Sequence, residues 1–476
     1  MKALSAAMIG IALLAVAGCS TSAPDAPDLQ GKVEQLAEDL RVPGMAVEVV
    51  DANGVVDRAL TGHDGNGEPI DERTPFVWGS VSKSVTAFVV SKLAAEGRVR
   101  LDAPVVSVVP AAAEVFDDQA TTVTDLIHHT SGLPHDLTRT DKWDRRQTAL
   151  ESVGDLSGVA VGERGSFRYS SLNYLLLQAV VERVTSQPFA NAVDREIGNP
   201  SGAGPIIADA QTFQQVVPPG HVPFFTVPTR TDIGFDQAGL GYGYLAGSIE
   251  QLGKYGSLQL RDSAGDDPAP VATGGEATYG HGWYVENMAG ADGTSTEVRW
   301  HSGAVPGYYT HVAVIPELGK AVVITAGMYG ELVADRLAGT ARSLVQAELG
   351  VPLPAPPGDE LYLGILGALV IAGLALLIWV GRIVVGLVRR KFVSRRTRSV
   401  AIRVVCAIVI GGALVLAGLY GLPMLAGAPI SVVSAWAPDV ALLIWILLAE
   451  IALVTGLLVL RAIVEHRRQA DDVATP

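Results

Sequence analysis

Three long apolar runs follow residue 360 and limit what this 476-residue chain can fold into. Each run, at 361–380, 404–427 and 440–460, is about as long as a bilayer-spanning helix, roughly 20 residues. The residues before them have the composition of a water-soluble domain. The sequence therefore predicts a globular domain, a linker and three membrane helices, at 29–350, 351–360, 361–386, 404–428 and 439–462.

Basic residues flank the predicted spans. The segment 387–403 between the first two spans is rich in arginine, and no acidic residue occurs from 361 to 438. By the positive-inside rule this segment is a cytoplasmic loop, and the tail 463–476 is cytoplasmic as well. The globular domain is then expected on the extracytoplasmic side of a bacterial cytoplasmic membrane.

The N-terminus, "MKALSAAMIGIALLAVAGCS", predicts the same location. It combines one positive charge at Lys2 with a short apolar run and small residues before Cys19, which is typical of an export signal. Residues 16–19 resemble a bacterial lipobox, so we expect a signal peptide at 1–19, lipidation of Cys19 and a polar tether at 20–28. An ordinary signal peptide or an uncleaved anchor is the alternative.

Charge and cysteine content exclude several functions. Residues after 360 contain eleven Lys/Arg and five Asp/Glu, which is a net charge of +6. Since the whole chain has a net charge of −14, the first 360 residues have a net charge of −20. An acidic domain of this kind is a poor partner for nucleic acid. Cys19 and Cys406, the two cysteines of the chain, lie in different apolar segments, so no disulfide or thiolate metal site is expected in the globular domain.

Strand patterns occur at both ends of the globular domain. Residues 44–63 read as two strands joined at Asn53-Gly54, and three strand-like runs followed by a helix occupy 295–350. The sequence between them is helical or irregular. This order predicts an α+β domain in which both ends of the chain build one antiparallel sheet around a helical insertion.

The segment "FVWGSVSKSVTAF" (76–88) places a lysine three residues after a serine. Apolar spacing predicts a core helix that starts near Ser80, and positions i and i+3 share one helix face. Ser80 could be an ordinary N-cap with Lys83 in solvent. Alternatively, a buried Lys83 of lowered pKa could take the proton of the Ser80 hydroxyl and make it a nucleophile.

The flanking sequence favours the second interpretation. "WGSVSKSVTA" resembles the first motif of the serine β-lactamase and penicillin-binding-protein superfamily, in the branch of class C β-lactamases, D,D-peptidases and esterases. Three further segments resemble motifs of that branch in the right order: "VTDLIHHTSGLP", "FRYSSLNYLLLQAVVERVT" and "WHSGAVPGY". The resemblance covers residues 29 to 350 and implies the β-lactamase/transpeptidase-like fold.

The resemblance also implies a set of site residues. Ser80 would be the acylated nucleophile, Lys83 its activator and Tyr169 a second proton-transfer group whose phenol is acidified by nearby positive charge. Backbone N–H groups of Ser80 and Ala304 would form the oxyanion hole. Ser171, His301 and Gly303 would contact the substrate, and neither a metal nor an organic cofactor is required.

Two positions depart from the pattern of the branch. Ser171 stands where that branch has an asparagine, which weakens contact with an acyl-amide substrate. His301 stands where β-lactamases and carboxypeptidases often have lysine, so the fixed positive charge that holds a substrate carboxylate is missing. Arg299, two residues earlier on the same strand, could supply that charge or could be a surface residue.

These features predict an exported, membrane-anchored serine hydrolase that acts on a small-molecule or peptide amide or ester. A D-amino-acid peptidase or an esterase is favoured over a dedicated β-lactamase. The alternative is a catalytically weak domain that binds a cell-wall fragment or a partner and signals or docks through the membrane helices. His128-His129 could suggest a metal, but no further ligand stands at suitable spacing.

Overall fold

The computed structural model describes residues 28–116, 120–262, 267, 269–389, 397–421 and 428–474. The expected signal peptide, the lipidation of Cys19, most of the tether and residues 390–396 of the basic loop lie outside these ranges. They therefore remain predictions.

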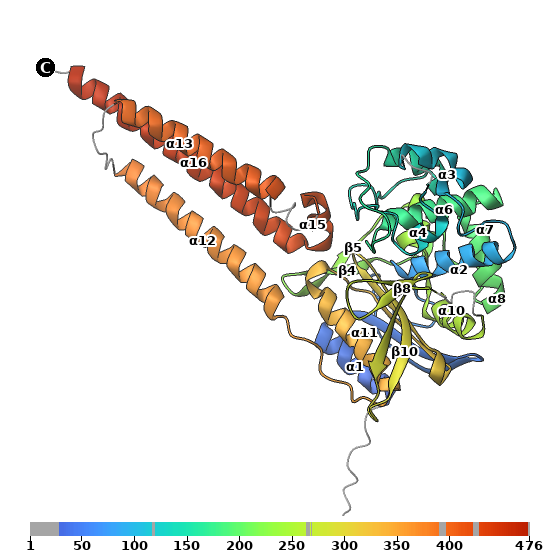
Figure 1. Cartoon of the computed structure of the whole chain (residues 1–476). Coiled ribbons are helices and arrows are strands. Elements are labelled where there is room, and N and C mark those ends of the chain that lie inside the picture. Colours follow the sequence, from blue (N-terminus) through green and yellow to red (C-terminus); the bar gives the residue numbers. More distant parts are fainter. Residues whose placement is uncertain are drawn as a thin grey trace, which may run out of the picture.

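An eight-stranded antiparallel sheet forms the centre of the globular domain (Figure 1). Its strand order is β2-β1-β12-β11-β10-β9-β8-β7, so β1 from the start of the domain pairs with β12 from its end. This confirms the predicted sheet built from both ends of the chain. The strands are β1 Gly44–Asp51, β2 Gly54–Gly62, β7 Val271–Ala272, β8 Thr278–Gly280, β9 Trp283–Ala289, β10 Ser295–Val305, β11 Tyr308–Ile315 and β12 Lys320–Ala326.

Both faces of the sheet are covered, because alternate residues of the central strands belong to different apolar clusters. In β12, Val323 packs into the cluster that includes α2 (Val81–Ala95), whereas Val322 and Ile324 pack into the cluster that includes α1 (Leu29–Leu40). Helix α11 (Ala334–Glu348) lies on the same face as α1 (Figure 1). The central strands are therefore apolar on both sides.

The helical insertion covers the other face and builds most of the larger cluster. Its longer helices are α2, α6 Ser171–Thr185 and α10 Ile249–Arg261, and the shorter ones are α3 Val105–Val108, α4 Val123–Ile127, α5 Ala149–Ser152, α7 Phe189–Val193, α8 Asn199–Ser201 and α9 Ala210–Val216. Helix α2 is buried over most of its length between α6, the π-helical turn Leu240–Tyr244 and strands β10 and β11, which explains why its sequence lacks a polar face. Lys83 is one of the buried residues of this helix.

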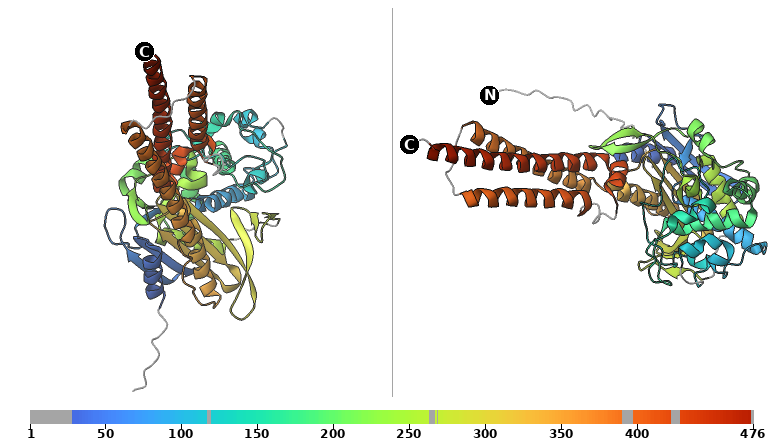
Figure 2. Two further views of the ribbon diagram at one scale, coloured as in Figure 1. Left: turned by 90° about the vertical axis from the view of Figure 1, so that its left-hand side faces the viewer. Right: turned by 90° about the horizontal axis from the view of Figure 1, so that it is seen from above.

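Within the described part of the chain, three helices are long and apolar enough to cross a membrane: α12 Glu360–Val388, α13 with its extension to Gly421, and α16 Pro438–Ala474. Helix α13 itself spans Thr397–Leu416, and a short helix, α15 Ile430–Trp436, precedes α16. The long helices lie side by side and extend away from the globular domain (Figure 2). The apolar runs of the sequence thus correspond to one bundle.

Polar contacts join the bundle to the globular domain. The hairpin β4 Gly220–Phe224 and β5 Val227–Thr231 has its tip at Phe225 and Thr226, both with positive φ. The Phe225 amide donates to Asp439 Oδ2 at 2.9 Å, and the Thr226 amide donates to the Tyr362 hydroxyl at 3.1 Å. Tyr362 in turn donates to Asp439 Oδ2 at 2.5 Å. Side chains of α12 and α16 therefore bind the backbone of the hairpin turn, whose two residues have strained φ values.

Replacement of Tyr362 by phenylalanine tests this joint. The variant leaves the half-buried Thr226 amide without its acceptor, and an unpaired donor that is kept from water costs up to about 1–3 kcal/mol. In nanodiscs we expect hydrogen exchange at the amides of 225–226 to be roughly 5- to 100-fold faster in Tyr362→Phe than in the unchanged chain. Tyr420→Phe, at an exposed position of another membrane segment, is the matched control, and equal exchange in all three proteins would contradict the joint.

Candidate active site

Ser80 stands at the N-terminal end of α2, at the bottom of a cavity. Its side chain makes no capping hydrogen bond to the helix, so the interpretation of Ser80 as an ordinary N-cap is wrong. Lys83 Nζ lies 2.9 Å from Ser80 Oγ. One helical turn therefore brings the amine within hydrogen-bond distance of the hydroxyl, as the i, i+3 spacing predicts.

Lys83 is completely buried, and its surroundings disfavour the positive charge. Burial lowers its pKa to about 7, and the more distant Asp141 carboxylate opposes this shift only weakly. The amine donates to the Tyr242 carbonyl oxygen at 2.9 Å, which fixes its position without a carboxylate partner. Near neutral pH a large fraction of Lys83 is thus the free amine, which can accept a proton from Ser80.

Tyr169 lies beside both groups. Its hydroxyl faces the Ser80 side chain, and Lys83 Nζ lies 4.9 Å from the centroid of its ring. The expected acidification of this phenol is wrong, because burial raises the pKa of Tyr169 well above its ordinary value. Tyr169 therefore keeps its proton at neutral pH and can relay a proton rather than act as a phenolate.

Two glycines allow β10 to pass the start of α2 at very short range. A Cβ on Gly303 would overlap the Trp78 carbonyl oxygen and crowd the Ser80 amide, and a Cβ on Gly79 would overlap the Ala304 amide. Gly79 also has φ +51°, which only glycine adopts without strain. This close approach brings the Ser80 and Ala304 N–H groups together at the cavity, as an oxyanion hole requires.

His301 lies behind the cavity and does not line it. Burial, with a smaller effect of Lys83, lowers its pKa to about 3, so the ring is neutral. Nδ1–H donates to the Ser302 carbonyl oxygen at 2.7 Å, and Nε2 faces the Tyr279 hydroxyl at 3.5 Å. This environment agrees with the expectation that His301 is neutral. It does not agree with the expectation that His301 contacts the substrate directly.

Ser171 lines the cavity as the first residue of α6, and none of the described residues that line the cavity is an asparagine or a glutamine. Asn173 is the nearest amide in the sequence, but it is fully buried. It accepts from the Ser131 hydroxyl at 2.5 Å and donates to His129 Nδ1 at 2.9 Å. Asn173 and the "HHTSG" segment are thus part of the support for the site.

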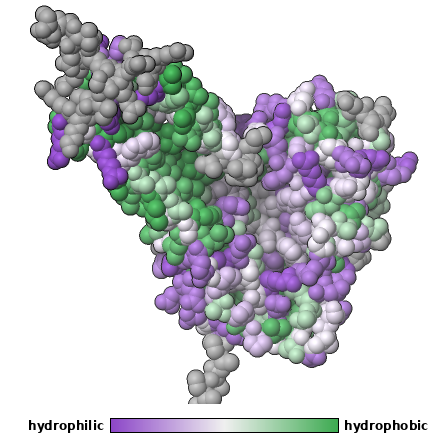
Figure 3. Space-filling view, turned by 60° about the vertical axis from the view of Figure 1, so that its left-hand side comes forward, coloured by the Kyte–Doolittle hydropathy of each residue, from purple (hydrophilic) through white to green (hydrophobic). Residues whose placement is uncertain are grey.

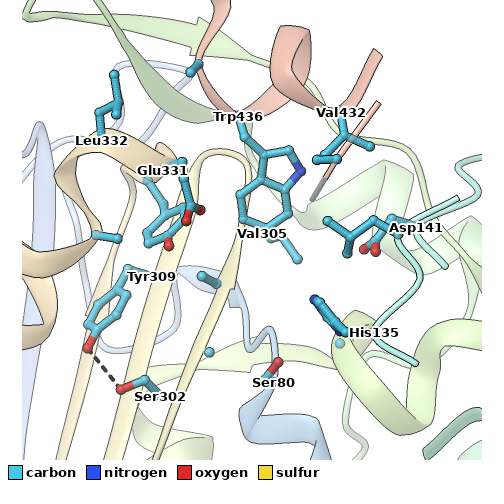
Figure 4. Close-up of a pocket in the computed structure, with 18 of the residues that line it drawn as sticks. Ser80, His135, Asp141, Ser302, Val305, Tyr309, Glu331, Leu332, Val432 and Trp436 are labelled. Carbon is cyan, nitrogen blue, oxygen red and sulfur yellow. Dashed lines mark hydrogen bonds between the residues drawn. The ribbon is translucent and has the colours of Figure 1, made fainter. Parts of the chain in front are cut away.

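The cavity has a volume of about 850 Å³ and a polar floor (Figure 4). Ser80 lies on this floor, Ser302 and Tyr309 form one side, and His135 and Asp141 form the other. Apart from Ser80, none of these was identified from the sequence. Ser302, within the His-Ser-Gly motif, had a local signal, whereas the others reach the cavity through loops and strand pairing without a motif of their own.

The cavity offers no fixed positive charge to a substrate. Among the described residues that line it, none is arginine or lysine, and three are carboxylates: Asp141, Glu331 and Asp335. Arg299 does not line the cavity, and its Nε pairs with Glu297 at 2.9 Å. Arg299 therefore does not replace the missing lysine of the third motif.

A separate cluster of possible metal ligands contains His128, Asp267 and His281, whose ligand atoms lie within 4.8 Å of one another. The sequence drew attention to His128-His129 but not to this cluster, because Asp267 and His281 are far from His128 in the chain. His128 Nε2 and Asp267 Oδ2 are 2.5 Å apart, closer than the roughly 3.3 Å between two ligand atoms of tetrahedral zinc. The observed arrangement is thus a hydrogen bond between the His128 ring and the Asp267 carboxylate.

A buried lysine next to a helix-terminal serine, a tyrosine and a crossing strand edge defines a serine hydrolase of the SxxK type. The comparison with known families agrees with this class. A model described as "Beta-lactamase" matches residues 29–346. The chain belongs to this family, within a superfamily of serine hydrolases that includes penicillin-binding proteins and class C β-lactamases.

Individual relatives are distant. Penicillin-binding protein 4 of Amycolatopsis lactamdurans is 25% identical over 364 residues, which cover 69% of this chain and 93% of that protein. Protein flp of Staphylococcus aureus (strain N315) is 24% identical, and the match covers 64% of each chain.

Two solved structures have a similar fold. A D-stereospecific amidohydrolase from Streptomyces sp. matches with a TM-score of 0.52 and 22% identity, over 63% of this chain and 95% of that one. A class C β-lactamase from Rhodobacter sphaeroides has a TM-score of 0.52 and 20% identity, over 63% of this chain and 93% of that one.

The lowered pKa of Lys83 predicts a pH dependence. A base acts only when it is unprotonated, so the reaction of Ser80 with a fluorophosphonate probe should become faster as pH rises through about 7 and should level off above roughly 8. The measurement is the labelling rate at Ser80 between pH 5 and 9. In Lys83→Arg the labelling rate at Ser80 should be lower by roughly 100-fold or more at every pH, because a guanidinium stays protonated. A flat profile for the unchanged chain would contradict the role of Lys83 as base.

Proposed function

We propose that the chain is a membrane-anchored serine hydrolase that cleaves an ester or amide through an acyl-enzyme on Ser80. The observation that carries this proposal is the 2.9 Å contact between Ser80 Oγ and a fully buried Lys83 amine whose pKa is about 7. A binding module has no use for a lysine buried without a carboxylate partner beside a serine.

In the first step, Ser80 Oγ attacks the carbonyl carbon of the substrate, and its proton passes to Lys83. The negative charge that develops on the carbonyl oxygen is held by the Ser80 and Ala304 N–H groups. When the bond to the leaving group breaks, that group takes a proton from Tyr169, and Tyr169 takes one from Lys83. The products of this step are the acyl-serine and a free alcohol or amine.

In the second step, water gives a proton to Lys83 and attacks the acyl carbon. Ser80 Oγ leaves and takes that proton back, which releases the acid and restores the site. Apart from the substrate and one water molecule, every group in both steps is a side chain or a backbone N–H group of the chain.

The charges of the cavity favour neutral substrates. A carboxypeptidase or β-lactamase must hold a substrate carboxylate, but here the described lining carries Asp141, Glu331 and Asp335 and no arginine or lysine. We therefore place esterase or D-amino-acid amidase activity ahead of β-lactam hydrolysis. The basic loop and the export-like N-terminus support an extracytoplasmic position of this site.

The first test is a burst experiment on the full-length chain in nanodiscs with p-nitrophenyl acetate. We expect one equivalent of nitrophenol to be released in a rapid phase that Ser80→Ala lacks. Ser82→Ala is the matched control, because Ser82 is buried on the same helix and its hydroxyl has no hydrogen-bond partner. Absence of a burst from folded protein would instead favour the domain that binds a cell-wall fragment or a partner.

Substrate charge gives a second prediction. Of two nitrophenyl esters that differ by one carboxylate on the acyl part, the neutral ester should have a kcat/KM roughly tenfold higher. Changing the two rim carboxylates, Glu331→Gln with Asp335→Asn, should narrow this difference without affecting the neutral ester. Preference for the carboxylate-bearing ester would overturn the charge argument.

A further inference from the structure

We propose that the substrate is an ester with a long apolar chain, resident in the bilayer leaflet next to the globular domain, and that the membrane helices bind this chain. The inference rests on the proposed function, because it assigns a substrate class to the same site. It is carried by the wall of the cavity opposite Ser80.

That wall belongs to the membrane helices. Starting from Ser80, the cavity continues past Val305 and Leu332 and ends against α12, α15 and α16 (Figure 4). Trp436 and Val432 lie on the opposite side of the cavity from Ser80. The residues that these helices and the link between α15 and α16 add to the wall are all apolar: Ile365, Val432, Val433, Trp436, Ala437 and Val440. A single hollow thus joins a serine with a neighbouring base to an apolar surface of the bundle.

The wall is a fixed part of the fold. Trp436 packs edge-on against Tyr329, with the ring centroids 5.7 Å apart, and a Cβ on Gly330 would lie 3.0 Å from the Trp436 carbonyl oxygen. The Tyr362–Asp439 contact holds the ends of α12 and α16 against the β4–β5 hairpin nearby. These contacts keep the apolar wall facing the serine.

The wall also lies near the ends of the membrane-length helices that face the globular domain. Ile365 is five residues into the span that starts at Glu360, which is about 7.5 Å along the helix, and Val440 is in the first turn of α16. Trp436, just before α16, is of the residue type enriched at membrane interfaces. Nearby side chains of α12 face outward, such as Leu361 and Leu363, which are 70% and 52% exposed.

Figure 3 shows the molecule hollowed between the green, apolar helices and the more hydrophilic globular domain. A chain anchored in the leaflet can reach this hollow without first crossing water. The carboxylates of the rim, Glu331 and Asp335, disfavour an anionic group but not a methylene chain. The volume of about 850 Å³ is within the range of sites that enclose a drug-sized ligand.

The test measures kcat/KM for p-nitrophenyl esters with acyl chains of two to twelve carbons, with the full-length chain in nanodiscs. Each methylene placed against the wall should raise kcat/KM roughly two- to fourfold until the wall is covered. Val432→Asn makes the wall polar and Ala437→Phe fills it, so in both variants kcat/KM should rise much less with the length of the acyl chain.

Ala435→Asn and Ala435→Phe are the matched controls, because Ala435 lies on α15 and does not line the cavity. Long esters partition equally into the nanodiscs of these controls and of the wall variants. The controls should therefore show the full dependence of kcat/KM on chain length. If kcat/KM does not depend on acyl-chain length, or if the wall variants show the full dependence, the inference is overturned. The proposed serine hydrolase activity would then still stand. If no ester gives a burst that depends on Ser80, the proposed function itself fails.

A second arm identifies the source of the substrate. A dodecanoyl ester preloaded in the nanodisc of the enzyme should react at least several-fold faster than the same ester supplied in separate nanodiscs, because it can diffuse laterally into the hollow. Equal rates would mean that the ester arrives from water, and would overturn entry from the leaflet.

Discussion

The burial of one lysine amine determines the arrangement around it. Near pH 7 the lowered pKa of Lys83 corresponds to roughly 4 kcal/mol of folding free energy lost relative to an exposed lysine. A nearby carboxylate would recover part of this energy, but it would also keep the amine protonated. The fold instead offers the Tyr242 carbonyl, from the π-helical turn Leu240–Tyr244, which positions the amine and leaves it a base.

Much of this fold could be predicted from the sequence, because its periodic patterns are strong. The paired strands at each end, the apolar helix that starts at Ser80 and the apolar runs after 360 correspond to elements of the structure. The Ser80–Lys83 contact was also predictable, since both residues lie on one helical turn. The environment of Tyr169 was not, because its pKa depends on burial by segments that are distant in sequence.

Other parts of the site carry no local signal. Asp141 and His135 come from loops, and the Tyr242 carbonyl is a backbone group that any residue type could provide. The wall formed by Val432 and Trp436 was hidden for a different reason. An apolar stretch near a membrane span is expected to face lipid, and only the docking of α15 and α16 on the globular domain turns it toward the serine.

The strand order has a consequence for how the chain is made. Met45 in β1 pairs with Ala326 in β12, and β12 lies between β1 and β11 in the sheet. During synthesis the first hairpin must therefore wait for almost the whole domain before its central neighbour exists, and such distant pairing is slow to form. The membrane helices follow within a few dozen residues. Completion of the sheet and insertion of α12 thus fall close together in time. A delay in the first would leave an apolar edge of the sheet exposed, and a delay in the second would leave an apolar helix exposed.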